Sequence, residues 1–140
     1  MEDPQVESPT SVRIAPLLTV EQKVDKSLRE QAFQINSEIF KKENPLPSPD
    51  DKDRVQKSPG IRGYLARWKM LRLEDKHKSL DHAERYFKGQ PHDRQSAGWG
   101  IDIAMDEANK RMAQTREDPD DAAAAEKDFA LLFRARLGLN

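Results

Sequence analysis

The chain has 140 residues, a length typical of one domain, and its formal net charge of −1 at pH 7 gives no overall bias toward nucleic acid or an anionic membrane. Hydrophobic residues make up 36% and charged residues 35%, a balance that suits helices with one apolar stripe each and argues against a thick sheet core. There is no cysteine, which excludes disulfides, thiolate metal sites and cysteine nucleophiles.

The pattern along the chain predicts an all-α fold of four to five helices, in a small bundle or an irregular helical domain. Residues 1–16 contain three prolines among Ser, Thr and acidic residues, and we interpret them as a flexible, disordered tail before a single helical domain over residues 17–140. The first residues lack the basic and apolar regions of a signal peptide, and no apolar run is long enough to span a membrane. We therefore expect a cytoplasmic protein, or one exported without a cleaved signal peptide.

The first predicted helix starts at Thr19, which forms a capping-box pattern with Gln22, and runs to about Lys42. Apolar residues recur every three or four positions and predict a single inward face. They are Val20, Val24, Leu28, Ala32, Ile35 and Ile39. Asn44-Pro45 is expected to end this helix, because proline disfavours the α conformation in the residue before it.

A proline-rich linker is predicted over residues 44–58, where alternating prolines indicate an extended, semi-rigid segment between the first and second helices. Ser58-Pro59 is typical of a helix start, with Ser58 as the N-cap. Residues 61–88 have a helical pattern interrupted by the polar run 74–78. Whether they form one helix or two is left open.

A loop is predicted over residues 90–100, because it contains Pro91 and places Trp99 between two glycines. A further helix is expected over about 101–116. The last helix is predicted to start at Asp118-Pro119, with Asp118 as the N-cap, and to end near Leu137.

Charge is distributed unevenly along the chain. Residues 54–78 contain eight Lys or Arg and two Asp or Glu, whereas residues 102–128 contain nine acidic and four basic residues. Attraction between these two segments across the fold is the simplest expectation.

Candidate catalytic and metal-binding groups are sparse. His77 and Asp81 are four residues apart and share a helical face, which is a spacing for two metal ligands, but no third ligand lies at a suitable spacing. Asp102 and Asp106 are related in the same way, and a solvated face explains them. Ser96 lacks the glycine pattern of a nucleophile elbow. The sequence therefore predicts no enzyme, no metal site and no cofactor.

The segment 61–78 is the most informative for function. Five apolar residues, from Ile61 to Leu71, cover one helical face, and basic residues lie beside them. Three interpretations are open: a core helix with basic side chains along its edges, a surface for a protein partner, or a surface for nucleic-acid phosphates. The predicted partner-binding residues are Arg62, Arg67, Trp68, Lys69, Met70, Leu73, Lys76 and Trp99.

These observations favour a non-catalytic protein that presents amphipathic helical faces to a protein partner, as an adaptor, an inhibitor or an effector. The alternative function is nucleic-acid binding through residues 54–78, which the near-neutral net charge disfavours. The apolar stripe of residues 20–39 offers a second interface, through which the chain would form a homodimer.

Overall fold

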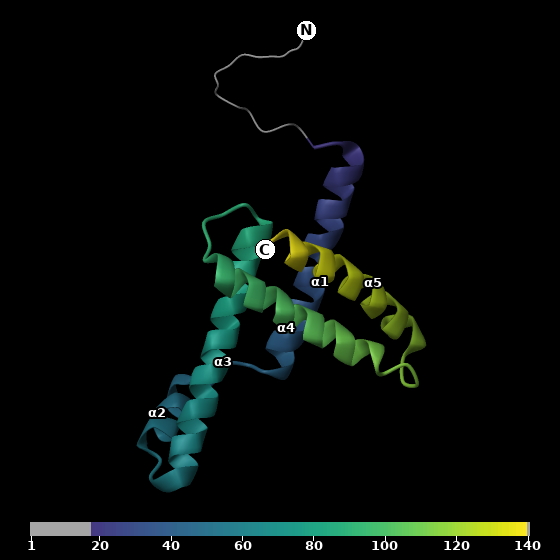
Figure 1. Cartoon of the computed structure of the whole chain (residues 1–140). Helices are drawn as coiled ribbons and strands as arrows, with labels where there is room; N and C mark the ends of the chain where they lie inside the picture. Colours follow the sequence, from purple (N-terminus) through teal and green to yellow (C-terminus); the bar gives the residue numbers. More distant parts are fainter. Residues whose placement is uncertain (1–17, 140) are drawn as a thin grey trace, which may run out of the picture.

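The computed structural model describes residues 18–139, and in this range the chain forms five α-helices and no strand (Figure 1). The helices are α1 (Val20–Glu43), α2 (Pro49–Lys57), α3 (Gly60–Phe87), α4 (Arg94–Met112) and α5 (Pro119–Gly138). The predicted all-α fold is confirmed. The predicted tail over residues 1–16 lies outside the described residues.

Two of the predicted helix starts are present as expected. Thr19 and Gln22 form the reciprocal capping box of α1, with backbone-to-side-chain distances of 2.9 and 3.1 Å. Asp118 caps α5 by accepting a hydrogen bond from the backbone N–H of Asp121 at 3.0 Å, and Pro119 occupies the first helical position. Each cap satisfies a backbone N–H that has no partner within its own helix.

The prediction of an extended linker over residues 44–58 is wrong, because this segment contains the nine-residue helix α2. Ser48 caps α2 by accepting from the Asp51 N–H at 3.2 Å, and Pro49 is the first helical residue, where its missing N–H does no harm. Acidic residues in the first turn and basic residues in the last complement the helix dipole.

Helix α3 is a single uninterrupted helix of 28 residues, which decides the question left open over 61–88. It starts one residue later than predicted: Pro59 is at the N-cap position, and Ser58 ends α2 instead. Gly63 allows the α2–α3 turn to pack closely, because a Cβ there would lie 2.0 Å from the Ser58 carbonyl oxygen. Arg67 donates a hydrogen bond to the same oxygen at 2.8 Å.

The predicted loop over residues 90–100 is also wrong in its second half, because α4 begins at Arg94 and includes Trp99. Asp93 caps α4 through the Ser96 N–H at 2.8 Å. The glycines around Trp99 serve helix packing: a Cβ on Gly100 would lie 2.2 Å from the Ser79 carbonyl oxygen of α3. Helix α4 ends at Met112, four residues before the predicted end.

The core lies where α4 packs against the C-terminal half of α3, against α5 and against the middle of α1. Small residues let the helices approach closely, and a few larger side chains fill the space between them. The fully buried members include Phe33, Leu80, Ala83, Ile101, Ala104, Ala108 and Leu132. The rings of Phe33 in α1 and Phe87 in α3 are 5.1 Å apart, which fixes α1 against the end of α3.

Helix α1 presents a different face to the core from the one predicted. Ala32 is buried as expected, but its buried neighbours are Phe33, Asn36 and Ser37, whereas Val20 and Val24 are exposed. Asn36 is buried because it donates to Asp128 of α5 at 3.1 Å and accepts from Arg111 of α4 at 2.9 Å. The inward face of α1 is therefore partly polar.

The N-terminal half of α3 projects from this body together with α2 (Figure 1). We call α2 and residues 60–74 of α3 the arm. Helix α2 packs on α3 and on no other helix. Within residues 18–139, no helix is both long enough and apolar enough to cross a lipid bilayer.

Candidate functional site

The arm exposes a row of large apolar side chains along one face of α3. We call this row the arm stripe, and its members are Ile61, Tyr64, Leu65, Trp68 and Leu71. Each side chain is between 47% and 75% exposed. Scattered exposed apolar residues are ordinary on a protein surface, but a contiguous row of this size is typical of an interaction site.

The arm stripe continues a face of α3 that is buried in the body. At 100° per residue, Leu65 and Trp68 lie on the same side of the helix as Ser79 and Ala83. In the body this side is covered by α4, because Gly100 packs directly on Ser79 and Ala83. Over the arm nothing among the described residues covers it. The part of this face over the arm is therefore apolar and open to solvent from Ile61 to Leu71, and the charged residues Arg72 and Asp75 separate it from the part that α4 covers.

Three predicted site residues belong to the inside of the arm. Met70 is buried, and it lines a shallow pocket of about 240 Å³ with Leu73, Val55 and the two prolines after α1. Arg67 donates hydrogen bonds to the carbonyl oxygens of Val55 and Ser58. The structure thus places Met70, Leu73 and Arg67 against α2, the helix that the linker prediction missed.

Trp99 joins the arm stripe at the corner between the arm and α4. It is exposed, and it lines a shallow pocket of about 490 Å³ with Arg72 and Lys76 of α3 and with Ile103 of α4. Asp75 and Asp102 also border this pocket. Arg72 connects the predicted residues Trp68 and Trp99, which are 31 positions apart in sequence, because it contacts the Trp68 ring and lines the same pocket as Trp99.

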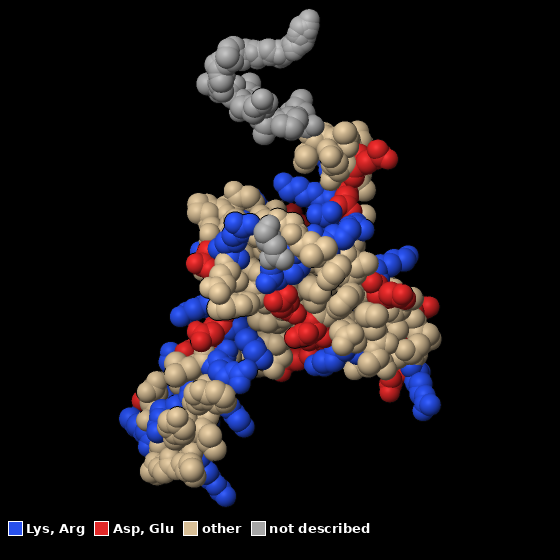
Figure 2. Space-filling view, in the orientation of Figure 1, with Lys and Arg blue, Asp and Glu red and all other residues tan. Residues whose placement is uncertain are grey.

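Basic side chains follow one edge of the arm stripe. Arg62, Lys69 and Lys76 are seven residues apart, or about two helical turns, so they lie in one row. Arg62 and Lys69 take part in none of the ion pairs of residues 18–139, and Lys76 Nζ lies 6.0 Å from the ring of Phe40. Figure 2 shows Lys and Arg projecting from the arm around a largely uncharged surface.

The cations of α2 are neutralised within the arm. Arg54 pairs with Asp51 at 2.6 Å, and Lys57 pairs with Asp53 at 3.1 Å. No ion pair of the described residues joins segment 54–78 to segment 102–128, so the expected attraction between them is not seen as direct contacts. The row of Arg62, Lys69 and Lys76 therefore has no carboxylate partner among residues 18–139, and Lys76 contacts only the Phe40 ring of the body as a cation.

Arg72 lies beside the aromatic part of the arm stripe. Its guanidinium carbon is 4.9 Å from the centre of the Trp68 ring, which is a cation–π contact. This contact orients the indole along the helix and places a charged donor next to it. Rigid aromatic and arginine side chains are the ones that contribute most to binding energy at protein interfaces.

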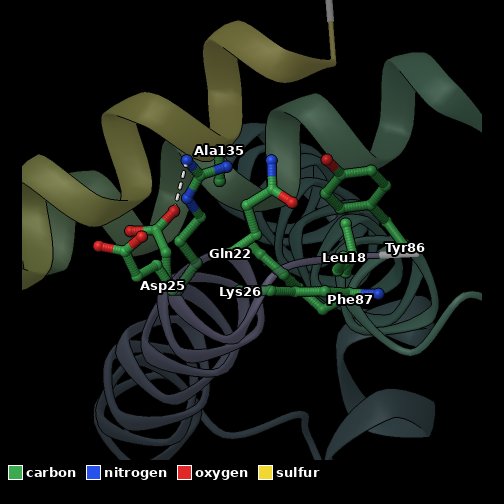
Figure 3. Close-up of a pocket in the computed structure, with 9 residues that line it drawn as sticks. Leu18, Gln22, Asp25, Lys26, Tyr86, Phe87 and Ala135 are labelled. Carbon is green, nitrogen blue, oxygen red and sulfur yellow. Dashed lines mark ion pairs between the residues drawn. The ribbon is translucent and has the colours of Figure 1, made fainter. Parts of the chain in front are cut away.

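A larger cavity of about 570 Å³ lies between the N-terminal half of α1 and the C-terminal ends of α3 and α5 (Figure 3). Tyr86, Phe87 and Ala135 provide its apolar side. Two of its charged groups are paired, since Asp25 of α1 contacts both Arg29, at 2.6 Å, and Arg134 of α5. These ion pairs tie α1 to α5 and assemble no reactive group.

The histidines and carboxylates considered as metal ligands have separate roles. His77 Nε2 lies 2.7 Å from the carbonyl oxygen of Asn44, Asp81 lies 3.9 Å from Lys41 Nζ, and Asp102 pairs with Arg136 at 3.0 Å. Within residues 18–139, no group of three His, Asp or Glu side chains is placed to hold a metal ion.

In the described part of the chain, the perturbed pKa values lie at contacts between helices, apart from that of Lys88, which a hydrogen bond to Glu84 one turn earlier in the chain raises. Burial, together with the nearby Glu43 carboxylate, raises the pKa of Glu107 on α4. Lys110 bridges the two carboxylates, at 2.8 Å from Glu43 and 4.0 Å from Glu107, and its hydrogen bond lowers the pKa of Glu43. This cluster joins the end of α1 to α4 and borders none of the cavities described above.

Comparison with known protein families, with curated proteins and with solved structures finds no match for this chain.

Proposed function

We propose that this protein is a non-catalytic interaction protein, which acts as an adaptor, an inhibitor or an effector by presenting the arm stripe to a protein partner. The observation that carries the proposal is the exposure of five large apolar side chains on one face of α3. With side-chain areas on the order of 150–250 Å² for the large residues, the arm stripe leaves on the order of 500 Å² of apolar surface in water. Covering such a surface is a substantial driving force for association.

The geometry of the arm supports the same proposal. Helix α2 buries the opposite side of α3, so that the arm stripe faces outward even though the arm is only two helices thick. A core helix would instead bury this face, as the C-terminal half of α3 does against α4. Trp68 with Arg72, and Trp99 at the corner, supply the aromatic and arginine anchors that concentrate binding energy.

The test is a comparative capture experiment from the native host. The arm variant carries Leu65→Glu and Leu71→Glu, and the matched control carries Phe133→Glu and Leu137→Glu on the exposed face of α5, outside the arm and the α1 stripe. Both pairs of side chains are solvent-exposed, so both variants should keep the wild-type circular dichroism spectrum. We expect a protein that co-purifies with the wild type and the control and is lost from the arm variant. A partner retained equally by all three proteins would disprove the proposal.

Nucleic-acid binding is the alternative function, and the unpaired row of Arg62 and Lys69 is the observation in its favour. It predicts that retention on a DNA column falls steeply with salt. Arg62→Ala and Lys69→Ala would abolish that retention, whereas Leu65→Glu and Leu71→Glu would reduce it only through their charge. Flow-through of the wild type at low salt would dismiss this alternative.

Self-association through residues 20–39 is a separate proposal about partners. Val20, Val24, Leu28 and Ile35 form an exposed stripe on α1, each between 44% and 76% exposed. Two copies of this stripe would bury one another in a homodimer. Light scattering that gives a monomer mass at high protein concentration would rule out this homodimer.

A further inference from the structure

Building on the proposed function, we infer that the partner of the arm is an acidic amphipathic α-helix, which lies along the arm stripe with carboxylates against Arg62, Lys69 and Lys76. The apolar row defines the length of the contact, and the basic edge defines its charge. The inference concerns the class of partner, and it is tested separately from the claim that the arm stripe binds a protein.

The case for a helix comes from the way α4 covers α3. In the body, α4 packs on the side of α3 that carries Ser79 and Ala83. Over the arm, Leu65 and Trp68 continue that side and are open to solvent. A helix placed there would cover the same side of α3 that α4 covers in the body, although it would pack on large side chains rather than on Ser79 and Ala83. Its end would meet Trp99 and Ile103 at the corner pocket of about 490 Å³.

The thickness of the arm argues against a partner that wraps around α3. Met70 and Leu73 on the other side of the helix are taken up by α2 and by the prolines that precede it. Only one face of α3 is open, so a partner that engulfs a whole helix would have to displace α2. A helix laid along the open face needs no such rearrangement.

The case for acidic chemistry comes from the edge of the arm stripe. Arg62 and Lys69 are exposed and have no ion-pair partner among residues 18–139. Spacing of seven residues places these cations about 10 Å apart along the helix, which matches carboxylates at seven-residue intervals on a facing helix. Charges arranged in this way select the partner and its register.

The same edge disfavours a second copy of this chain as the occupant. If two arms paired antiparallel through Trp68, the basic edge of one arm would face the basic edge of the other. Lys69 would lie opposite its own counterpart, and Arg62 would lie near Lys76. Asp75 is the exposed acidic residue next to the arm stripe, and it borders the corner pocket rather than the basic edge. Like charges that face each other across an interface oppose association.

The probe is a dye-labelled synthetic amphipathic helix of about 20 residues, or about 30 Å of helix, with leucines along one face and glutamates at seven-residue intervals beside them. A matched peptide carries lysine in place of each glutamate. Binding to the full chain is followed by fluorescence anisotropy. The charge-reversal variant is Arg62→Glu with Lys69→Glu, and its matched control is Lys23→Glu with Lys127→Glu, which changes net charge equally at exposed sites outside the arm.

We expect the wild type and the control to bind the glutamate peptide and the charge-reversal variant to bind it about 10- to 100-fold more weakly, which corresponds to one to two decades in Kd. The lysine peptide should show the opposite preference and bind the charge-reversal variant best. Failure of the wild type to bind the glutamate peptide, equal binding of both peptides, or no effect of charge reversal would overturn the inference.

Two other occupants would be recognised in the same experiments. Duplex DNA that binds through Arg62 and Lys69 when the glutamate peptide does not would replace the acidic helix with nucleic acid. Sedimentation that shows a wild-type dimer dissociated by Leu65→Glu would replace it with a second copy. If the peptides fail but capture in the native host still depends on Leu65 and Leu71, the proposed function stands and only the acidic helix is rejected.

Discussion

Arg111 joins three helices from a buried position on α4. Its guanidinium donates to Asp121 at 2.6 and 3.1 Å, to Asp128 at 3.0 Å and to Asn36 at 2.9 Å. The hydrogen bond from Arg111 lowers the pKa of Asp121 and thereby keeps that carboxylate charged. A buried guanidinium whose donors are satisfied from two other helices fixes how α1 and α5 sit on α4.

Replacing Arg111 with methionine should therefore lower the free energy of unfolding by about 3–5 kcal/mol, since it leaves the carboxylates of Asp121 and Asp128 without their cation. Urea denaturation followed by circular dichroism measures the change. Arg116→Met, in the exposed turn before α5, is the matched control and should change stability by less than about 0.5 kcal/mol. Equal changes in the free energy of unfolding at the two positions would mean that the buried hydrogen bonds of Arg111 do not stabilise the fold.

Glu107 should make stability depend on pH in the opposite sense from a salt-bridged carboxylate. Its pKa in the folded state is raised by burial and by Glu43, so the unfolded chain loses this proton more readily than the folded chain does. Folding is therefore penalised progressively as the pH rises from the unfolded pKa through the folded one. Glu107→Gln removes the penalty and should raise Tm at pH 7, and the gain should shrink as the pH falls toward the unfolded-state pKa of about 4.5.

The control for this prediction is Glu117→Gln, in the exposed turn after α4. Subtracting its Tm change at each pH removes the general effect of deleting one negative charge. A Tm difference for Glu107→Gln that stays constant between pH 3 and pH 7, an interval spanning the usual carboxyl pKa values, would show that its raised pKa has no effect on folding.

At the scale of the elements, the contact between α3 and α4 depends on the absence of a side chain at Gly100. A Cβ there would lie 2.2 Å from the Ser79 carbonyl oxygen and 2.7 Å from the Ala83 Cβ, and backbone cannot move aside as a flexible side chain can. Gly100→Ala should therefore destabilise the fold by about 1–3 kcal/mol, despite the higher helix propensity of alanine.

Gly138→Ala provides the matched control in thermal or urea denaturation. A Cβ at this position would be 3.9 Å from the Tyr86 hydroxyl oxygen, which is an ordinary contact. We expect this variant to be neutral or slightly more stable than the wild type. A Gly100→Ala variant as stable as Gly138→Ala would show that α3 and α4 can move apart to accommodate a Cβ at position 100 without loss of stability.

The sequence predicts correctly the helix starts that are set by capping residues close together in the chain. The Thr19 capping box and the Asp118-Pro119 start are complete in the sequence, and both are present in the structure. Helix α2 has the same kind of signal in Ser48-Pro49, but the three alternating prolines around it favour an extended segment. A proline at the first position of a helix starts it rather than breaks it.

The other wrong predictions concern contacts between helices that are far apart in the sequence, and a local sequence pattern carries no information about such contacts. Gly98 and Gly100 resemble loop residues in sequence, and only the presence of α3 and α5 against α4 explains them as packing positions. The apolar face of α3 was recognisable from its spacing, but which side is exposed depends on α2. Because that helix was missed, Met70 and Leu73 were assigned to the partner surface instead of the interior of the arm.

At the scale of the whole molecule, the arm and the body differ in how much of their backbone is held by packing. Helix α2 has no buried residue and contacts α3 alone, whereas α4 contacts α1, α3 and α5. Backbone amides exchange with solvent through local opening where few buried contacts resist it. Amides of α2 should therefore exchange much faster than those of residues 97–108, as hydrogen–deuterium exchange with mass spectrometry will show.

Removing the α2 cap sharpens this prediction. Ser48→Ala deletes the hydrogen bond to the Asp51 N–H, a change that typically costs about 0.5–2 kcal/mol of helix stability. Exchange should accelerate in residues 49–57 and stay unchanged in residues 97–108. Equal acceleration in both segments would mean that arm and body unfold as one unit.

The unbroken course of α3 has a mechanical consequence. At about 1.5 Å per residue, its 28 residues make a rod of about 42 Å that is clamped at one end by α4 and free at the other. Anything gripped at the free end is held at a set offset and orientation from the body, as by a rigid bracket. A force applied at the free end would act through the length of α3 on the crossing at Gly100, where the backbones of α3 and α4 lie close together.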